Sequence, residues 1–261
     1  MSVGLAGIAL ASVVQFFALQ TRKMKGHTYR IEAQQALRTS LDAIARDLRL
    51  AGACLPSTGA YVPLAGTEGA TDSITVRTGI VRNNLSCIVA GLTATMAAGA
   101  STATVDSPAG FSAGMLAYLR HPSGSGQFLF VTAVGATTVT LSGAATIDYP
   151  IGSGIYAIDE RTYAIDAVSV PGIPVLTLTI NRGAPEAFSA GLQDLQIRYV
   201  LNRNCPPCDI VNAPLAADTA TWRLVNSVLL AATVKTIGTV RAEDAITITQ
   251  TSSAKPRNLL P

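Results

Sequence analysis

The chain has 261 residues, of which 13% are charged, about half of the roughly 25% that is typical of soluble domains. Its net charge is +3, and no basic stripe interleaved with aromatic residues occurs, so nucleic-acid binding is not expected. The length allows one large domain or two small ones, and the abundance of Ala, Gly, Thr and Ser favours an exported protein that packs against neighbours over a cytosolic enzyme.

The chain opens with an uncharged run. No side chain from Ser2 to Gln20 is charged, and Arg22, Lys23 and Lys25 follow it closely. The run is close to the roughly 20 residues that a membrane-crossing helix needs. A cleaved signal peptide is the alternative, but the run is longer than a usual signal core and no basic segment precedes it.

A helical pattern continues beyond the apolar run. Leu37, Leu41, Ile44 and Leu48 are spaced four, three and four residues apart, which places them along one helical face. Arginines in the last turns and Gly52 mark the C-terminal end. We therefore expect one helix over 1–52, on the order of 75 Å long at 1.5 Å per residue.

From residue 53 the hydrophobic period changes to alternation, which is typical of strands. We expect a β-rich head over 53–250, with an inserted glycine-rich β module at 92–148, and a tail at 251–261. The motif YAID occurs twice, at 156–159 and 163–166, and this spacing predicts a hairpin. The predicted class is α+β, with a long helix, apolar and then amphipathic, packed on the head. The strands are predicted at 72–78, 128–134, 138–141, 175–180, 195–201 and 245–251.

The four cysteines are Cys54, Cys87, Cys205 and Cys208, and they allow three pairings. An apolar leading segment indicates an oxidising compartment, so disulfides are the default interpretation. We favour the two pairings that are local in sequence, Cys54–Cys87 and Cys205–Cys208. The second pair forms a CPPC motif, for which thiol chemistry and metal binding are the alternatives.

A search for catalytic motifs finds none, so we predict a protein that is not an enzyme and has no cofactor or bound metal. His27 and His121 are the only histidines, too few for a histidine-rich metal centre. The adjacent pair Asp159–Glu160 would point to opposite faces of a strand, which favours a hairpin turn over an acid–base dyad. Trp222, the only tryptophan, is expected to anchor the core of the head.

The layout resembles the type IV pilin-like proteins, and within them the PilW-like minor pilins. "EAQQALRTSLDAIARDLRLAG" (32–52) resembles the exposed half of the family's helix, and "DSITVRTG" (72–79) resembles its following strand. "SAGLQDLQIRYVL" (189–201) and "TWRLVNSVLLAATV" (221–234) resemble a late strand and a tryptophan-led strand.

The resemblance implies a minor pilin that assembles into or primes a type IV pilus for adhesion or motility. The helix would first anchor in the inner membrane, with the head in the periplasm, and later pack on other pilin and minor pilin subunits in the fibre. Gly4 and Gly7 would allow close approach of helices. The alternative within this architecture is a minor pseudopilin of a type II secretion system. From another class, the alternative is a membrane-anchored periplasmic thiol or metal protein that uses the CPPC motif.

The sequence departs from the family at its start. Type IV prepilins carry a basic leader, a glycine at the cleavage point and a glutamate five residues into the helix, and Met1-Ser2-Val3-Gly4 resembles a point after that glutamate. Basic residues only after the apolar run would place the head in the cytoplasm. We therefore expect the true start, with the leader, to lie upstream of Met1; the alternatives are a truncated protein and a divergent member that is not processed.

Overall fold

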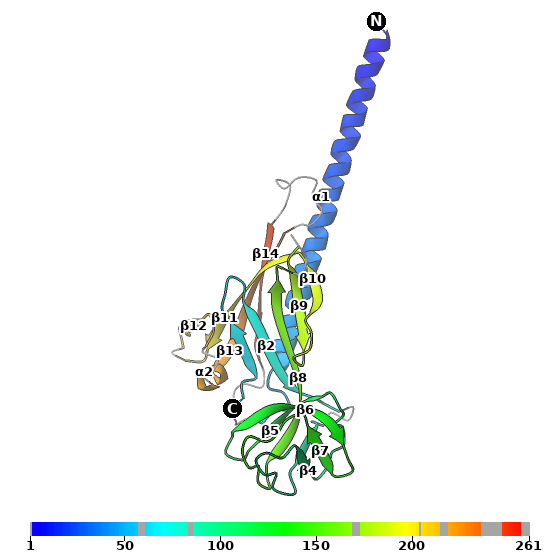
Figure 1. Cartoon of the computed structure of the whole chain (residues 1–261). Coiled ribbons are helices and arrows are strands. Elements are labelled where there is room, and N and C mark those ends of the chain that lie inside the picture. Colours follow the sequence, from blue (N-terminus) through cyan, green and yellow to red (C-terminus); the bar gives the residue numbers. More distant parts are fainter. Residues whose placement is uncertain are drawn as a thin grey trace.

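A computed structural model describes residues 2–56, 61–82, 86–168, 173–203, 205–214, 219–235 and 247–256, with backbone alone for 2–12, 22 and 219. Within these residues it contains two helices and fourteen strands (Figure 1). The helices are α1 (Ser2–Leu50) and α2 (Thr219–Arg223). The strands are β1 (Leu64–Thr67), β2 (Ser73–Gly79), β3 (Val89–Gly91), β4 (Thr102–Thr104), β5 (Leu116–Arg120), β6 (Gly126–Val134), β7 (Thr138–Leu141), β8 (Gly154–Asp166), β9 (Val175–Ile180), β10 (Glu186–Ala190), β11 (Leu192–Leu201), β12 (Ile210–Val211), β13 (Val225–Lys235) and β14 (Thr247–Ala254).

The long N-terminal helix forms as its pattern predicts and runs for 49 residues. Gly52 follows its last turn with a φ of 80°, a conformation that glycine adopts without a steric cost. Its amide donates a hydrogen bond to the carbonyl of Arg77 in β2, so the helix end is tied directly to the sheet.

The described strands form two antiparallel sheets. The large sheet has ten strands, with the path β1-β2-β8-β5-β6-β7-β4, while β3 and β9 also pair with β8 and β10 pairs with β9. The small sheet has four strands in the order β12-β11-β13-β14. The expected α+β class is therefore wrong, because every described element after α1 except the five-residue α2 is a strand. The protein is mainly β, and only the C-terminal third of α1 enters its core.

Strand β8 connects two parts of the large sheet. Its first residues pair with β3 and β5, and its last residues pair with β2 and β9. The predicted hairpin is wrong, since both YAID copies lie in this one 13-residue strand. The sequence between the copies, Glu160-Arg161-Thr162, has no turn-forming residue, so the chain stays extended.

The buried apolar residues gather in three clusters. The helix–sheet core joins α1, part of the large sheet and the small sheet, and the module core lies within 88–157. Between them the junction cluster contains Tyr61, Leu116, Tyr118 and Ile158. Figure 1 shows the strands of the module core at the end of the molecule farthest from the N-terminus.

Two element boundaries predicted from the sequence differ from those in the structure. Trp222 lies in α2, and the strand predicted to begin with it begins at Val225. The first residues of the predicted tail belong to β14, which extends to Ala254. The remainder of that tail, 257–261, and residues 245–246 of the predicted last strand lie outside the described residues.

Candidate assembly surface

The predicted helical stripe is buried against the head of its own chain. Leu37, Leu41, Ile44 and Leu48 are each at most 1% exposed, and all four lie in the helix–sheet core. The helix contacts β14, β13, β10 and β2. These four leucine and isoleucine side chains therefore fix α1 on the head, and they leave the opposite side of the helix free.

A buried polar clamp holds the same half of the helix. Asp47, 6% exposed, accepts a hydrogen bond of 2.7 Å from the Tyr163 hydroxyl and one of 3.2 Å from Arg161. Arg161 also pairs with Asp159 at 3.0 Å. Burial, and then the hydrogen bond to Asp47, raise the pKa of Tyr163, because both disfavour a phenolate there. The clamp fixes the helix at a single register on β8.

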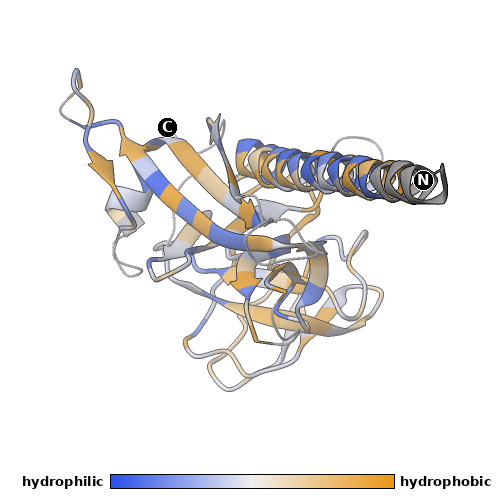
Figure 2. Ribbon diagram, turned by 90° about the horizontal axis from the view of Figure 1, so that it is seen from above, coloured by the Kyte–Doolittle hydropathy of each residue, from blue (hydrophilic) through white to orange (hydrophobic). Residues whose placement is uncertain are grey.

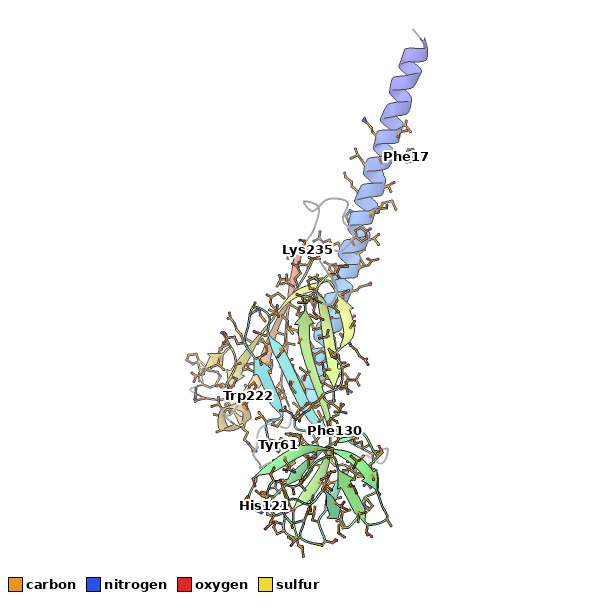
Figure 3. The ribbon with its side chains drawn as sticks, in the orientation of Figure 1. Phe17, Tyr61, His121, Phe130, Trp222 and Lys235 are labelled. Carbon is orange, nitrogen blue, oxygen red and sulfur yellow. A yellow bond between two sulfur atoms is a disulfide. The ribbon has the colours of Figure 1, made fainter. Side chains whose placement is uncertain are left out.

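The N-terminal half of the helix stands clear of the sheets. Figure 1 shows it projecting beyond them, and Phe17, labelled in Figure 3, lies far from the head. Every side chain described between Val13 and Lys25 is exposed. Figure 2, seen from above, shows hydrophobic and hydrophilic residues alternating along this projecting part.

Four of the exposed apolar residues between positions 13 and 31 of α1 form what we call the outward stripe: Val13, Phe17, Met24 and Ile31. Their exposed fractions are 49%, 64%, 69% and 53%. Their spacings of four, seven and seven residues place them on one side of the helix, roughly 110–150° around the axis from the buried stripe. Repeats of seven are typical of helices that pack on other helices. An apolar stripe without a covering partner marks an interaction surface.

The two glycines that were predicted to pack helices together lie in the first turns of α1. Gly4 and Gly7 belong to residues 2–12, for which only the helical backbone is described. Their predicted role in close helix packing stays a prediction.

Among the residues that the structure describes, no helix carries an apolar window long enough to cross a membrane.

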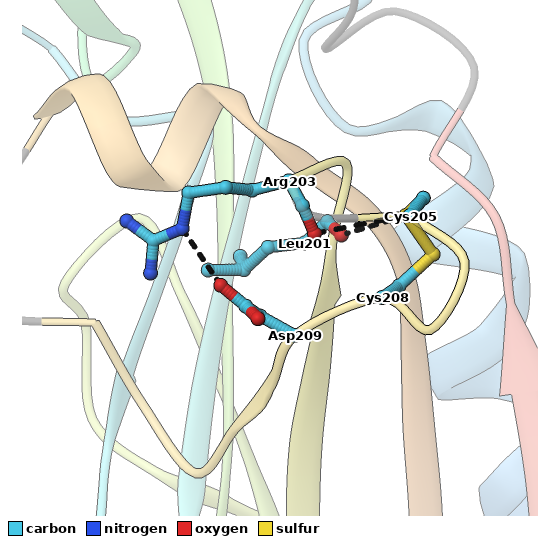
Figure 4. The surroundings of a disulfide bond; sticks show 5 residues. All are labelled: Leu201, Arg203, Cys205, Cys208 and Asp209. Atoms are coloured by element: carbon cyan, nitrogen blue, oxygen red, sulfur yellow. Dashed lines mark hydrogen bonds and ion pairs between the residues drawn. A yellow bond between two sulfur atoms is a disulfide. The ribbon is translucent and has the colours of Figure 1, made fainter.

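The four cysteines form two disulfides, Cys54–Cys87 and Cys205–Cys208, and the described residues contain no free cysteine. The first bridge spans 33 residues and ties the end of α1 to the strand region of the module. The second closes a short loop whose base is also held by Arg203 and Asp209, 2.8 Å apart (Figure 4). A structural disulfide and the oxidised form of a redox pair would both have this arrangement.

Trp222 is fully buried in the helix–sheet core, the position that we expected of a core anchor. Its ring packs edge-on against Tyr199, with 5.0 Å between the ring centroids.

A buried ion-pair network around Glu160, which the sequence did not reveal, joins neighbouring segments of the head. Glu160, 4% exposed, accepts from Arg77 at 2.6 Å and from Arg182 at 3.0 Å, and it lies within β8, so the predicted hairpin turn at this position is wrong. Burial alone would raise the pKa of Glu160, but the hydrogen bond from Arg182 and the charge of Arg77 outweigh it and lower the pKa. Both guanidinium groups also lie over the Phe128 ring, at 5.3 and 5.0 Å.

In the described part of the chain, no three His, Cys, Asp or Glu side chains gather as a metal site would require. A groove of about 650 Å³ lies over β11, β13 and β14, and Arg198 is its one charged lining residue among those described. The described side chains that line this groove include no nucleophile with a neighbouring base.

No family model matches the sequence. No curated protein matches it either. Among solved structures, a type IV-like pilin from Thermus thermophilus aligns with 87% of this chain and 97% of its own length, at 11% identity and a TM-score of 0.39. The likeness is therefore distant.

Proposed function

We propose that this chain is a PilW-like minor pilin, a structural, non-catalytic subunit that assembles into or primes a type IV pilus. The observation that carries the proposal is the outward stripe on a helix that is fixed to its head by one face and uncovered on the other. The sequence resemblance at 32–52, 72–79, 189–201 and 221–234 supports it independently.

The energetics of the exposed apolar side chains favour helix-on-helix assembly. Burying one large apolar side chain stabilises a complex by roughly 1.5–3 kcal/mol. Phe17 and Met24 each keep about two thirds of their surface exposed, so a neighbouring helix could remove most of that area from water. The partners in this proposal are the corresponding helices of other pilin and minor pilin subunits.

The other parts of the molecule have roles that fit a fibre subunit. The inner membrane would hold the chain before assembly, and the two disulfides suit a head exposed to the periplasm or the cell surface. The module within 88–157 lies at the end opposite the N-terminus, where it would project from the fibre for adhesion.

The experiment that tests this function uses the gene with its upstream codons in its own host. A variant carrying Phe17→Gln, Met24→Gln and Ile31→Gln should be lost from the sheared pilus fraction, because the outward stripe no longer buries apolar surface.

The matched control carries Ile151→Gln, Val168→Gln and Ile180→Gln, three exposed apolar residues of the head. It should stay in the pilus fraction. Equal incorporation of both variants, or absence of the wild-type chain from the fraction, would overturn the proposal.

A further inference from the structure

A cluster of positive charge follows the exposed apolar part of α1. Lys23, Lys25 and Arg30 are all exposed, and we call them the basic collar. Residues 2–31 contain no Asp or Glu, and the nearest carboxylate on the head side of the collar is Glu32. Among the described residues, none of the three takes part in an ion pair, in contrast to Arg38, which lies 3.8 Å from Asp42. The collar therefore presents uncompensated charge.

The collar surrounds the helix and is not confined to one face. At 100° per residue, Lys25 lies roughly 200° around the axis from Lys23, while Arg30 returns to the side of Lys23. A groove on a protein partner contacts one side of a helix. A layer of lipid headgroups contacts every side of a helix that enters it, so the distribution fits a membrane surface better than a protein groove.

The position of the collar along the axis also fits a membrane surface. Lys23 lies about 6 Å along the axis from Leu19, the last of the exposed apolar residues before it, and the collar covers about 10 Å. A headgroup layer is roughly 5–8 Å thick, and long cationic side chains can extend along the helix to reach it. Apolar residues such as Phe17 could thus enter the acyl layer while the cations meet the headgroups.

The head begins directly beyond the collar. Ala33, the first buried residue among the described side chains of α1, is about 5 Å farther along the axis than Arg30. Lys235 lies at this end of the head, labelled in Figure 3, and lines the recess around Tyr29 and Glu32. Lys235 and Glu32 carry opposite charges in this recess, and the three cations of the collar lie next to it along the helix.

We propose that the basic collar binds the headgroups of anionic phospholipids and so sets the depth at which α1 sits in an acidic membrane. The site recognises negative charge at a lipid surface, without stereospecific contacts. The proposal concerns the same helix as the proposed assembly role but does not depend on that role, because binding of a single chain to a vesicle requires no fibre.

The test is flotation of the full chain with vesicles of phosphatidylcholine alone and of phosphatidylcholine with 30% phosphatidylglycerol. Each Lys or Arg near an acidic surface strengthens binding roughly fivefold. The three charges of the collar should therefore contribute on the order of 100-fold to the wild-type preference for the anionic vesicles, and Lys23→Gln, Lys25→Gln and Arg30→Gln together should lower that preference by the same factor. Salt at 1 M should weaken the wild-type preference because it screens the charges.

The control is Arg38→Gln, Arg46→Gln and Arg49→Gln, which removes the same charge from exposed positions of the head-bound half of α1. It should keep the preference of the wild type. Equal loss in both variants would show that only net charge matters, and a wild-type chain without any preference would point to an acidic protein as the partner. Either result would overturn the proposal.

Discussion

Replacing Asp47 by alanine tests whether the polar clamp fixes α1 on the head. The variant leaves the Tyr163 hydroxyl buried without its acceptor at 2.7 Å, a loss of roughly 1–3 kcal/mol. Arg161 adds about 1 kcal/mol or less, because its side chain is 37% exposed and keeps Asp159 as a partner. We expect a total loss of about 3 kcal/mol, seen as a lower midpoint in urea and a melting temperature lower by roughly 6–12 °C.

The matched control is Asp42→Ala, on the same helix. Asp42 pairs with Arg38 at 3.8 Å with both side chains largely exposed, so its loss should cost less than about 0.5 kcal/mol. A double-mutant cycle of Asp47→Ala with Tyr163→Phe should give a coupling of about 1–2 kcal/mol. The reasoning is refuted if Asp47→Ala is no more destabilising than Asp42→Ala, or if the coupling is zero.

Two further predictions concern pH and the disulfides. The pKa of Glu160 is lowered in the folded protein, so its ion pairs stabilise the fold at pH values above the ordinary glutamate pKa of about 4.3, and this contribution is lost as the pH falls below that value. In urea unfolding between pH 7 and 3, the free energy of unfolding should therefore decline more steeply for the wild type than for Glu160→Gln. Parallel curves would contradict this. Loop-closure entropy predicts that replacing Cys54 and Cys87, which are 33 residues apart, by serine lowers the free energy of unfolding by about 4 kcal/mol. The same replacement of Cys205 and Cys208, which are 3 residues apart, should lower it by about 1.5 kcal/mol. Equal melting temperatures of the two double variants would be evidence against that account.

Local patterns predicted the elements whose signals lie within a few residues. The spacing of Leu37, Leu41, Ile44 and Leu48 correctly predicted the helical face that packs on the head. Alternation predicted β7 and β9 at their observed bounds. These patterns succeed because a helix or a strand buries one face at its own period.

The features that the sequence did not reveal depend on distant partners. Asp47 looks like one more polar residue of an amphipathic helix, but its partner Tyr163 is 116 residues away. Glu160 was expected in a hairpin turn, and its two arginine partners were not foreseen because they lie far along the chain, in β2 and beyond β9. The fold class was wrong because the conspicuous helix was weighted equally with a head whose described elements are strands except for the five-residue α2.

The outward stripe could have been found in the sequence. Phe17, Met24 and Ile31 recur every seven residues, but the basic residues between them obscured the pattern. Only the structure shows that this side of α1 is turned away from the face that packs on the head.

The most direct test of the proposed assembly role is photo-crosslinking from the outward stripe. A benzoylphenylalanine placed at Met24 in the full chain, in cells that make the fibre, should on irradiation crosslink to the N-terminal helix of another subunit, identified by mass spectrometry. Crosslinks confined to the chain's own head, or none in the fibre fraction, would contradict the assignment of α1 as an assembly helix.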